Sequence, residues 1–128
     1  MVLISHSWAH VLFDTGASHS FISVAFASVL RLEFERLESP LQLDTPGGSN
    51  EVSLVCKSCR ITVDGNHFLA DLFVLPMSVF DVILGMDWLG KYKAIVDCAK
   101  MHITLQSWKG KTLIFQARMN LLKPSPFL

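Results

Sequence analysis

Short apolar segments separated by turn-forming residues recur along the whole chain. Some alternate apolar and polar residues, as in Leu41–Leu43 and Glu51–Val55, which is typical of a strand with one buried face. Others, such as Val11–Phe13, are apolar throughout, as expected of a short buried strand. The predicted strands are Val2–Ile4, His10–Phe13, Leu41–Leu43, Glu51–Val55, Arg60–Val63, His67–Leu75, Phe80–Leu84, Ala94–Val96, His102–Leu105 and Thr112–Phe115. This spacing predicts an all-β, mainly antiparallel fold, a small barrel or sandwich, with one or two short helices.

Turn signals indicate which of these strands form hairpins. Thr45–Asn50 holds two adjacent glycines between alternating segments, which predicts a hairpin with a glycine-rich tip. Asp64–Asn66 reads Asp-Gly-Asn and predicts a tight turn between the strands on either side. Near the N-terminus, we predict that Val2–Ile4 and His10–Phe13 form a short hairpin that leads to Asp14.

Two segments have the character of short helices. Phe21–Leu30 suits either a helix or a buried strand, and we favour a helix with Ser20 as its N-cap. Met86–Tyr92 predicts one or two helical turns, with Asp87 placed favourably near the N-terminus. Arg31–Glu38 carries most of the early charge and is interpreted as a solvated connection.

Length and composition indicate one domain with a substantial core. The chain has 128 residues, enough for one domain and not for two, and 51% of them are hydrophobic. The mean hydropathy is +0.42, which also allows an apolar surface patch that a second subunit would cover. We assign the domain to residues 1–116 and interpret the proline-punctuated residues 117–128 as a linker or tail.

Charge and hydropathy argue against binding to nucleic acid or to a membrane. The 11 basic and 11 acidic residues give a net charge of +0, and no basic stripe is present. Phe21–Leu30 is the most apolar run, but it is too short and too rich in serine to span a bilayer. No signal peptide is evident, and the odd number of cysteines favours a reducing compartment. We therefore expect a cytoplasmic protein.

The spacings of the cysteines and histidines do not predict a metal site. Cys56 and Cys59 have the spacing of zinc ligands, but no second pair supplies the two further ligands that zinc needs. We predict instead that both cysteines lie on a strand. His6 and His10 lack the glutamate that completes the helical zinc-protease motif. No metal or organic cofactor is expected.

The stretch from Val11 to Ser18 carries the strongest chemical signal. Three apolar residues lead directly into Asp14-Thr15-Gly16. A carboxylate at the end of a buried strand is costly unless the surrounding structure uses it. Gly16 allows a sharp turn or the close approach of another backbone, and Thr15 can hydrogen-bond to hold the turn. Asp-Thr-Gly is also an ordinary strand-end turn, so the tripeptide alone does not establish a catalytic site.

Three linked features together resemble the retropepsins, the dimeric aspartic proteases of retroviruses and LTR retroelements. They are the apolar strand that ends in Asp14-Thr15-Gly16-Ala17, the glycine-tipped hairpin that follows, and the later triplet Ile83-Leu84-Gly85. The strings from Leu12 to Ile22 and from Phe80 to Leu89 look like those of gypsy-type retrotransposon proteases. The resemblance covers nearly the whole chain, from Val2 to Phe115.

The resemblance implies a closed β fold of the acid-protease type and a homodimer, since the chain has only one Asp-Thr-Gly. Aspartic proteases use two carboxylates that share one site, where one is protonated and the other ionised. Asp14 from each subunit would hold a water molecule that attacks the peptide carbonyl. Thr15 would brace the two catalytic loops across the dimer axis, and Gly16 would contact the substrate backbone.

The same resemblance assigns substrate binding to a further set of positions. The substrate would be a peptide or polyprotein held by Gly16, Ala17, Ser18, Gly47, Gly48 and Ile83. The two adjacent glycines would sit on a flap that closes over the peptide and excludes water. The implied setting is a retroelement polyprotein in the cytoplasm or in virus-like particles.

Some positions depart from the viral pattern and leave alternatives open. Ser18 stands where viral relatives usually carry an aspartate, and Met86-Asp87 follows Gly85 where those relatives carry an arginine. An inert retropepsin-like domain that serves only in assembly or binding would keep the same fold. A small β-barrel binding module with a chance Asp-Thr-Gly is the third alternative.

Overall fold

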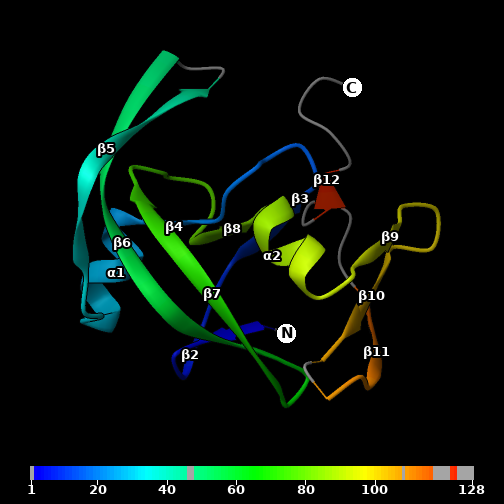
Figure 1. The fold of residues 1–128 in the computed structure, drawn as a ribbon. Helices are drawn as coiled ribbons and strands as arrows, with labels where there is room; N and C mark the ends of the chain where they lie inside the picture. Colours follow the sequence, from blue (N-terminus) through cyan, green and yellow to red (C-terminus); the bar gives the residue numbers. More distant parts are fainter. Residues whose placement is uncertain (1, 46–47, 108, 117–121, 124–128) are drawn as a thin grey trace.

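The computed structural model describes residues 2–45, 48–107, 109–116 and 122–123. Its main feature is a curled nine-stranded sheet with the strand order β12-β3-β8-β4-β7-β6-β1-β2, in which β5 also pairs with β6. A separate three-stranded sheet has the order β11-β10-β9 (Figure 1). Most strand pairs are antiparallel, and two short helices accompany them. The predicted all-β class with one or two short helices is therefore confirmed.

The N-terminal segment folds differently from the predicted hairpin. Strand β1 (Val2–Ile4) pairs with β2 (Ser7–Trp8), because Ser5 and His6 both adopt positive φ and close a two-residue turn. The next strand, β3 (Val11–Asp14), instead runs parallel to β8 (Val82–Leu84). The prediction that the first segment pairs with His10–Phe13 is therefore wrong, and β3 lies inside the sheet.

A long hairpin and its neighbour form the largest part of the sheet. Strands β5 (Glu35–Thr45), β6 (Gly48–Val63) and β7 (Asn66–Leu75) are consecutive antiparallel neighbours. The β5–β6 hairpin extends beyond the rest of the sheet (Figure 1). The predicted glycine-tipped hairpin is confirmed as a pairing, although residues 46–47 at its tip lie outside the described part. The tight turn before β7 is also confirmed, with Asp64 and Gly65 both at positive φ.

Two details of these strands differ from the sequence prediction. Strand β5 already begins at Glu35, so the last four residues of the predicted solvated connection belong to a strand, and the first two of them, Glu35 and Arg36, pair with β6. The segments Glu51–Val55 and Arg60–Val63 belong to one continuous strand, β6. A register shift between Cys56 and Cys59 interrupts its pairing with β7 and conceals this continuity in the sequence.

The segment Phe21–Leu30 combines both alternatives that its sequence allowed. Phe21–Ser23 forms strand β4, which lies between β7 and β8, and Val24–Leu30 forms helix α1. Ser23 is the N-cap, and its side chain accepts a hydrogen bond from the Phe26 amide. Ser20 is therefore not the cap. The first residues form a strand because neighbouring strands pair on both sides and bury them.

The second half of the chain follows its predicted elements closely. Helix α2 (Met86–Lys91) begins with Asp87 in its first turn, as expected. Strands β9 (Ile95–Asp97), β10 (His102–Gln106) and β11 (Thr112–Gln116) form the small sheet. A short strand, β12 (Leu122–Lys123), lies parallel to β3 within the stretch interpreted as a tail. The division at residue 116 stays a prediction. None of the described helices is long and apolar enough to cross a membrane.

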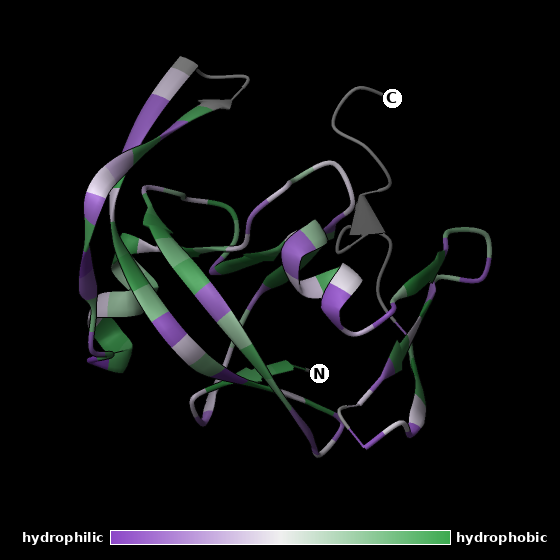
Figure 2. Cartoon of the chain, viewed as in Figure 1, coloured by the Kyte–Doolittle hydropathy of each residue, from purple (hydrophilic) through white to green (hydrophobic). Residues whose placement is uncertain are grey.

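The core lies inside the curl of the main sheet and beneath α2. Along β6 and β7, hydrophobic and hydrophilic residues alternate in bands, so that one face is apolar (Figure 2). The largest fully buried side chains are Trp88, Phe13, Phe68, Ile4, Ile22, Ile61, Leu72, Leu84, Ile103, Leu105, Val11 and Val52. Burying such side chains supplies the main stabilisation of the fold, about 1.5–3 kcal/mol for each.

Candidate functional site

Asp14 is a buried acid at the end of a strand whose other residues are all buried. Only 7% of its surface is exposed, and β3 pairs with β8 on one side and with β12 on the other. One carboxylate oxygen accepts a hydrogen bond from the Gly16 amide at 2.9 Å, and the Ala17 amide donates to the Asp14 carbonyl at 3.2 Å. These bonds fix the carboxylate on its own turn, as the sequence pattern predicted.

The turn after Asp14 rests directly on the segment that ends β8. The Met86 amide donates to the Ala17 carbonyl at 2.7 Å. At Gly85, an added Cβ would lie 2.2 Å from the carbonyl oxygen of His19 and 2.6 Å from that of Ala17. Only glycine allows the two backbones to come this close. The apolar-apolar-glycine triplet therefore packs directly against the turn that follows Asp14 and supports it.

A hydrogen-bond network links the two segments, and the sequence did not predict its role. The Ser20 hydroxyl accepts from the Gly85 amide at 2.9 Å and donates to Asp87 Oδ1 at 2.6 Å. The Ser20 amide donates to Asp87 Oδ2 at 3.2 Å, and the Trp88 amide donates to Oδ1 at 2.7 Å. Ser20 and Asp87 lie within the two strings that resemble retroelement proteases, which is the signal that could have identified them.

Replacing Ser20 with Ala is expected to lower the free energy of unfolding by about 2 kcal/mol. The Gly85 amide would lose its acceptor in a site where Ser20 is fully buried, and Asp87 would lose a short hydrogen bond. Urea unfolding measures the change. Ser18→Ala is the matched control, because the Ser18 hydroxyl is exposed and its bond to the neighbouring His19 ring is local. Equal stabilities for the two variants would contradict a structural role for Ser20.

Aromatic packing supports the strand that carries Asp14 from the core side. Phe13 lies with its ring centroid 6.3 Å from that of Trp88 and 5.6 Å from that of Phe115. Trp88 also contacts Phe68 and Tyr92, and its indole N–H has no hydrogen-bond partner among the described residues. The tyrosine hydroxyl both donates to the Leu69 carbonyl and accepts from the Leu69 amide. This packing restricts movement of the strand that carries Asp14.

Ile83 lies at the base of the β5–β6 hairpin. It is half-buried on β8 and packs against a second apolar cluster formed by Phe21, Val52 and Leu75. Leu41 and Leu43 of β5 also pack against this cluster. Ile83 thus connects the hairpin to the segment that supports the Asp14 turn, and its predicted contact with substrate stays a prediction.

The remaining predicted site residues divide into described and undescribed positions. Gly16 and Ser18 are exposed, while Thr15 and Ala17 are half-buried, so the turn presents several groups at the surface around Asp14. Gly48 is the first residue of β6 and is paired with Thr45, whereas Gly47 lies outside the described residues. Among the described residues, no group of three or more His, Cys, Asp or Glu side chains is placed to hold a metal ion.

Comparison with known proteins identifies the family. The family model described as Retroviral aspartyl protease matches residues 1–111. The chain belongs to the retroviral aspartyl protease family. A comparison with curated protein sequences returned no match. Asp14, the last residue of β3, lies within the matched residues.

Two solved structures agree with this assignment. The retroviral protease-like domain of Ddi1 from Leishmania major has a TM-score of 0.66 at 15% identity, over 93% of this chain and 92% of that chain. EIAV protease complexed with the inhibitor HBY-793 has a TM-score of 0.61 at 26% identity, over 75% of this chain and 88% of that chain. The predicted barrel of the retropepsin type is therefore confirmed. The individual roles of the predicted site residues stay predictions.

Proposed function

We propose that this chain is an aspartic endopeptidase that acts as a homodimer, with one Asp14 from each subunit. The observation that supports the proposal best is the buried Asp14, fixed by the Gly16 amide on a turn in a retroviral aspartyl protease fold. A single carboxylate cannot supply both the acid and the base of peptide hydrolysis. The chemistry is complete only when a second copy contributes its own Asp14.

In the proposed mechanism, two Asp14 side chains hold one water molecule between them. Two carboxylates close enough to hold the same water molecule share one proton, as in the aspartic proteases that serve as the general example of this effect. The ionised carboxylate takes a proton from the water as the water oxygen attacks the peptide carbonyl. The protonated carboxyl donates its proton to the developing oxyanion. Collapse of the tetrahedral intermediate then breaks the C–N bond and releases the amine with a proton from the pair.

An apolar surface beside the catalytic turn supports pairing with a second copy. A groove of about 500 Å³ is lined by Thr15, by one charged residue, Lys93, and by the mostly apolar set Met86, Leu89, Gly90, Ala94 and Val96. Met86 is 47% exposed, and the neighbouring Ile95 is 66% exposed. Exposed apolar residues gathered in one place are typical of an interaction surface. A second copy that covered this groove would bring its own Asp14 turn close to the first, because Thr15 directly follows Asp14.

The proposed substrate and cellular location follow from the two sequence segments, Leu12 to Ile22 and Phe80 to Leu89, that resemble retroelement proteases. Both strings are similar to those of gypsy-type retrotransposon proteases, so we propose a retroelement polyprotein as the substrate. Gly16, Ala17 and Ser18 would contact the peptide backbone, Ile83 would contact a side chain, and Gly47 and Gly48 would cover the peptide. The proposed location is the cytoplasm or a virus-like particle.

A transition-state mimic of the pepstatin type is expected to bind with one molecule for every two chains. The reason is that its central hydroxyl group replaces the shared water between two Asp14 side chains, and such mimics bind far more tightly than substrates. Isothermal titration calorimetry measures the stoichiometry, and a rise in the unfolding temperature provides a second readout.

Two variants test whether the dimer is required for this binding. Met86→Lys adds a charge to the apolar groove and should raise the dimer dissociation constant at least about tenfold, or about 1.4 kcal/mol. Val29→Lys is the control, because Val29 is even more exposed but lies on α1, away from the groove. Binding of one mimic to each single chain would contradict the proposal. A stable dimer that neither binds the mimic nor cleaves peptides would indicate an inert domain.

A further inference from the structure

Cys56 and Cys59 flank the irregular part of β6, where two strands change their register. Cys56 lies opposite Leu72 of β7, and Cys59 lies opposite Ala70. Three residue steps on β6 therefore match two steps on β7. At roughly 3.3 Å for each step of β7, the two cysteine Cα atoms are about 6.6 Å apart. Disulfides join Cα atoms that are roughly 4.4–6.8 Å apart, so this bulge brings the two residues within reach of a bond.

The two thiol groups lie on the same face of the strand and contact each other. Leu72 and Ala70 both point into the core, and the cysteines opposite them are likewise buried, with 5% and 4% of their surfaces exposed. The Cys59 thiol donates a hydrogen bond to the Cys56 sulfur. In a regular strand, residues three positions apart point to opposite faces. The bulge is therefore what brings the two sulfur atoms together.

The hydrogen bond shifts the pKa values of the two thiols in opposite directions. The donated bond from Cys59 lowers the pKa of Cys56, although burial and the negative charge of Asp71 act in the opposite direction. The pKa of Cys59 is raised by the same hydrogen bond, by burial and by the charge of a Cys56 thiolate. Cys56 is thus the better nucleophile, because the thiolate is the reactive form.

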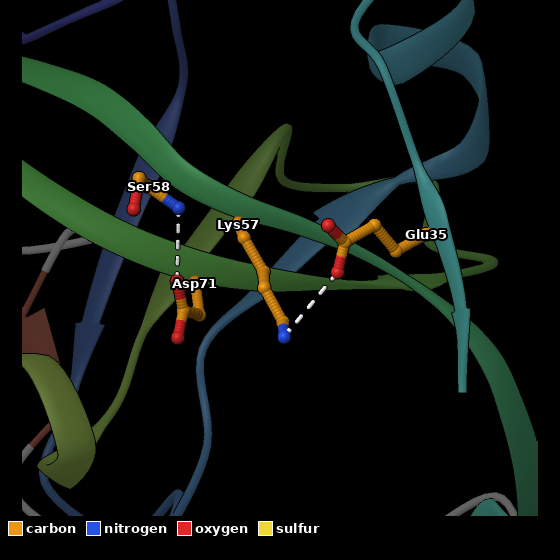
Figure 3. A network of polar contacts seen from close by, with 4 residues as sticks. All are labelled: Glu35, Lys57, Ser58 and Asp71. Carbon is orange, nitrogen blue, oxygen red and sulfur yellow. Dashed lines mark hydrogen bonds and ion pairs between the residues drawn. The ribbon is translucent and has the colours of Figure 1, made fainter. Parts of the chain in front are cut away.

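Polar contacts anchor the bulge to both neighbouring strands (Figure 3). Ser58 has a positive φ of 52°, and its amide donates to Asp71 Oδ1 of β7 at 2.9 Å. Lys57 Nζ lies 3.3 Å from Glu35 Oε2 of β5. The ion pair is exposed and contributes little to stability, but both contacts favour the same local geometry. The sulfur atoms are therefore held close together before any reaction.

A cavity gives small molecules access to this pair. Its volume is about 420 Å³, and Cys56 and Cys59 both line it, together with Lys57, Arg60, Glu33 and His6. The positive charges of Lys57 and Arg60 at the cavity are balanced by Glu33 and by the Glu35 partner of Lys57, so the charges at the cavity do not repel an anionic reagent. The third cysteine, Cys98, is exposed and lies elsewhere, on the segment after β9.

We propose that Cys56 and Cys59 are a redox-active dithiol that a low-molecular-weight disulfide, such as oxidised glutathione, converts into an intrachain disulfide. The Cys56 thiolate attacks one sulfur of oxidised glutathione and releases one glutathione thiolate. Cys59 then loses its proton and attacks the Cys56 sulfur of the mixed disulfide, which releases the second glutathione thiolate. Two protein thiols are oxidised, and one glutathione disulfide is reduced to two thiols. In the mixed disulfide, Cys56 carries no charge, so one cause of the raised pKa of Cys59 is removed.

The test incubates the folded chain with glutathione buffers of increasing oxidised fraction, followed by alkylation and mass measurement of its peptides. We expect a peptide that carries a Cys56–Cys59 disulfide, while Cys98 is found alkylated or as a mixed disulfide with glutathione. Cys59→Ser should stop at a mixed disulfide on Cys56. In Cys56→Ser, Cys59 should react at least about tenfold more slowly than Cys56 does in Cys59→Ser, because less of it is thiolate.

Cys98→Ser is the matched control and should form the Cys56–Cys59 disulfide at the same oxidised fraction as the unchanged chain. The proposal is overturned if both cysteines stay reduced while Cys98 forms a mixed disulfide. It is also overturned if the intrachain bond appears only after the chain is unfolded in urea. Circular dichroism of each variant establishes that the measurements refer to folded protein.

Discussion

Asp14→Asn is expected to lower kcat/KM for peptide cleavage by about 10³-fold or more while leaving the fold intact. Acid–base groups contribute about 10²–10⁴-fold each, and the substitution changes both members of the proposed pair at once. Asparagine has nearly the same shape as aspartate, and its carbonyl oxygen can still accept the hydrogen bond from the Gly16 amide. The turn should therefore keep its geometry while losing the group that takes a proton from water.

The assay follows cleavage of an unstructured protein at mildly acid pH, together with the unfolding temperature of each variant. Asp97→Asn is the control, because Asp97 lies on β9 and its carboxylate accepts a local hydrogen bond from the Lys100 amide. The Asp97→Asn variant should cleave the substrate at the same rate as the unchanged chain. Undiminished cleavage by Asp14→Asn would remove Asp14 from the mechanism.

The same assay should give a bell-shaped pH profile for the unchanged dimer. Activity requires one protonated and one ionised carboxyl, so cleavage should decline when the pair is fully protonated and also when it is fully ionised. Both limbs of the profile would belong to the coupled pair and not to either residue alone. A constant rate from about pH 4 to 8 would contradict a shared proton.

Gly85→Ala is expected to destabilise the folded chain by about 3 kcal/mol, near the upper end for overpacked sites. The new Cβ would lie 2.2 Å from the His19 carbonyl oxygen, which is backbone and cannot move aside like a flexible side chain. Separating the two segments would also weaken the hydrogen bonds from the Gly85 amide to Ser20 and from the Met86 amide to Ala17. Urea unfolding should show a lower midpoint, and peptide cleavage should fall with it.

Gly90 offers a matched control five residues along the chain. An added Cβ at Gly90 would meet nothing within 4 Å. Because Gly90 lies in α2, replacement by alanine should be neutral or stabilise the fold by up to about 1 kcal/mol. If Gly85→Ala and Gly90→Ala had equal effects, the close approach of Gly85 to the segment after Asp14 would have no energetic importance.

Local patterns predicted those elements whose determinants are close together in the sequence. The Asp64-Gly65 turn requires positive φ at both positions, and the sequence supplies an ideal pair of residues for it. The strands β7 and β10 were also placed correctly, because each alternates buried and more exposed residues and has one face toward the core. Asp14 was predicted to be fixed at a strand end, and the hydrogen bond from Gly16 agrees with that prediction.

The features that the sequence did not predict depend on contacts between distant segments. Strand β3 pairs with β8 in parallel, and no local signal indicates a partner that far away. Ser20 was interpreted as a helix cap because serine before an apolar run has that pattern, but its hydroxyl instead bonds to Gly85 and Asp87. The bulge between Cys56 and Cys59 reverses the alternation along β6, so one strand had the pattern of two.

The parallel pairing of β3 with β8 also determines when the site can form during protein synthesis. Val11 faces Val82 in this ladder, and the nearby bond from the His10 amide to Asp81 joins residues 71 positions apart. Closing so long a loop costs entropy that local contacts do not repay, which slows folding. A nascent chain whose β8 is still inside the ribosome therefore has no ordered Asp14 turn. Under the proposed function, self-cleavage of a growing polyprotein would have to wait until this strand leaves the ribosome.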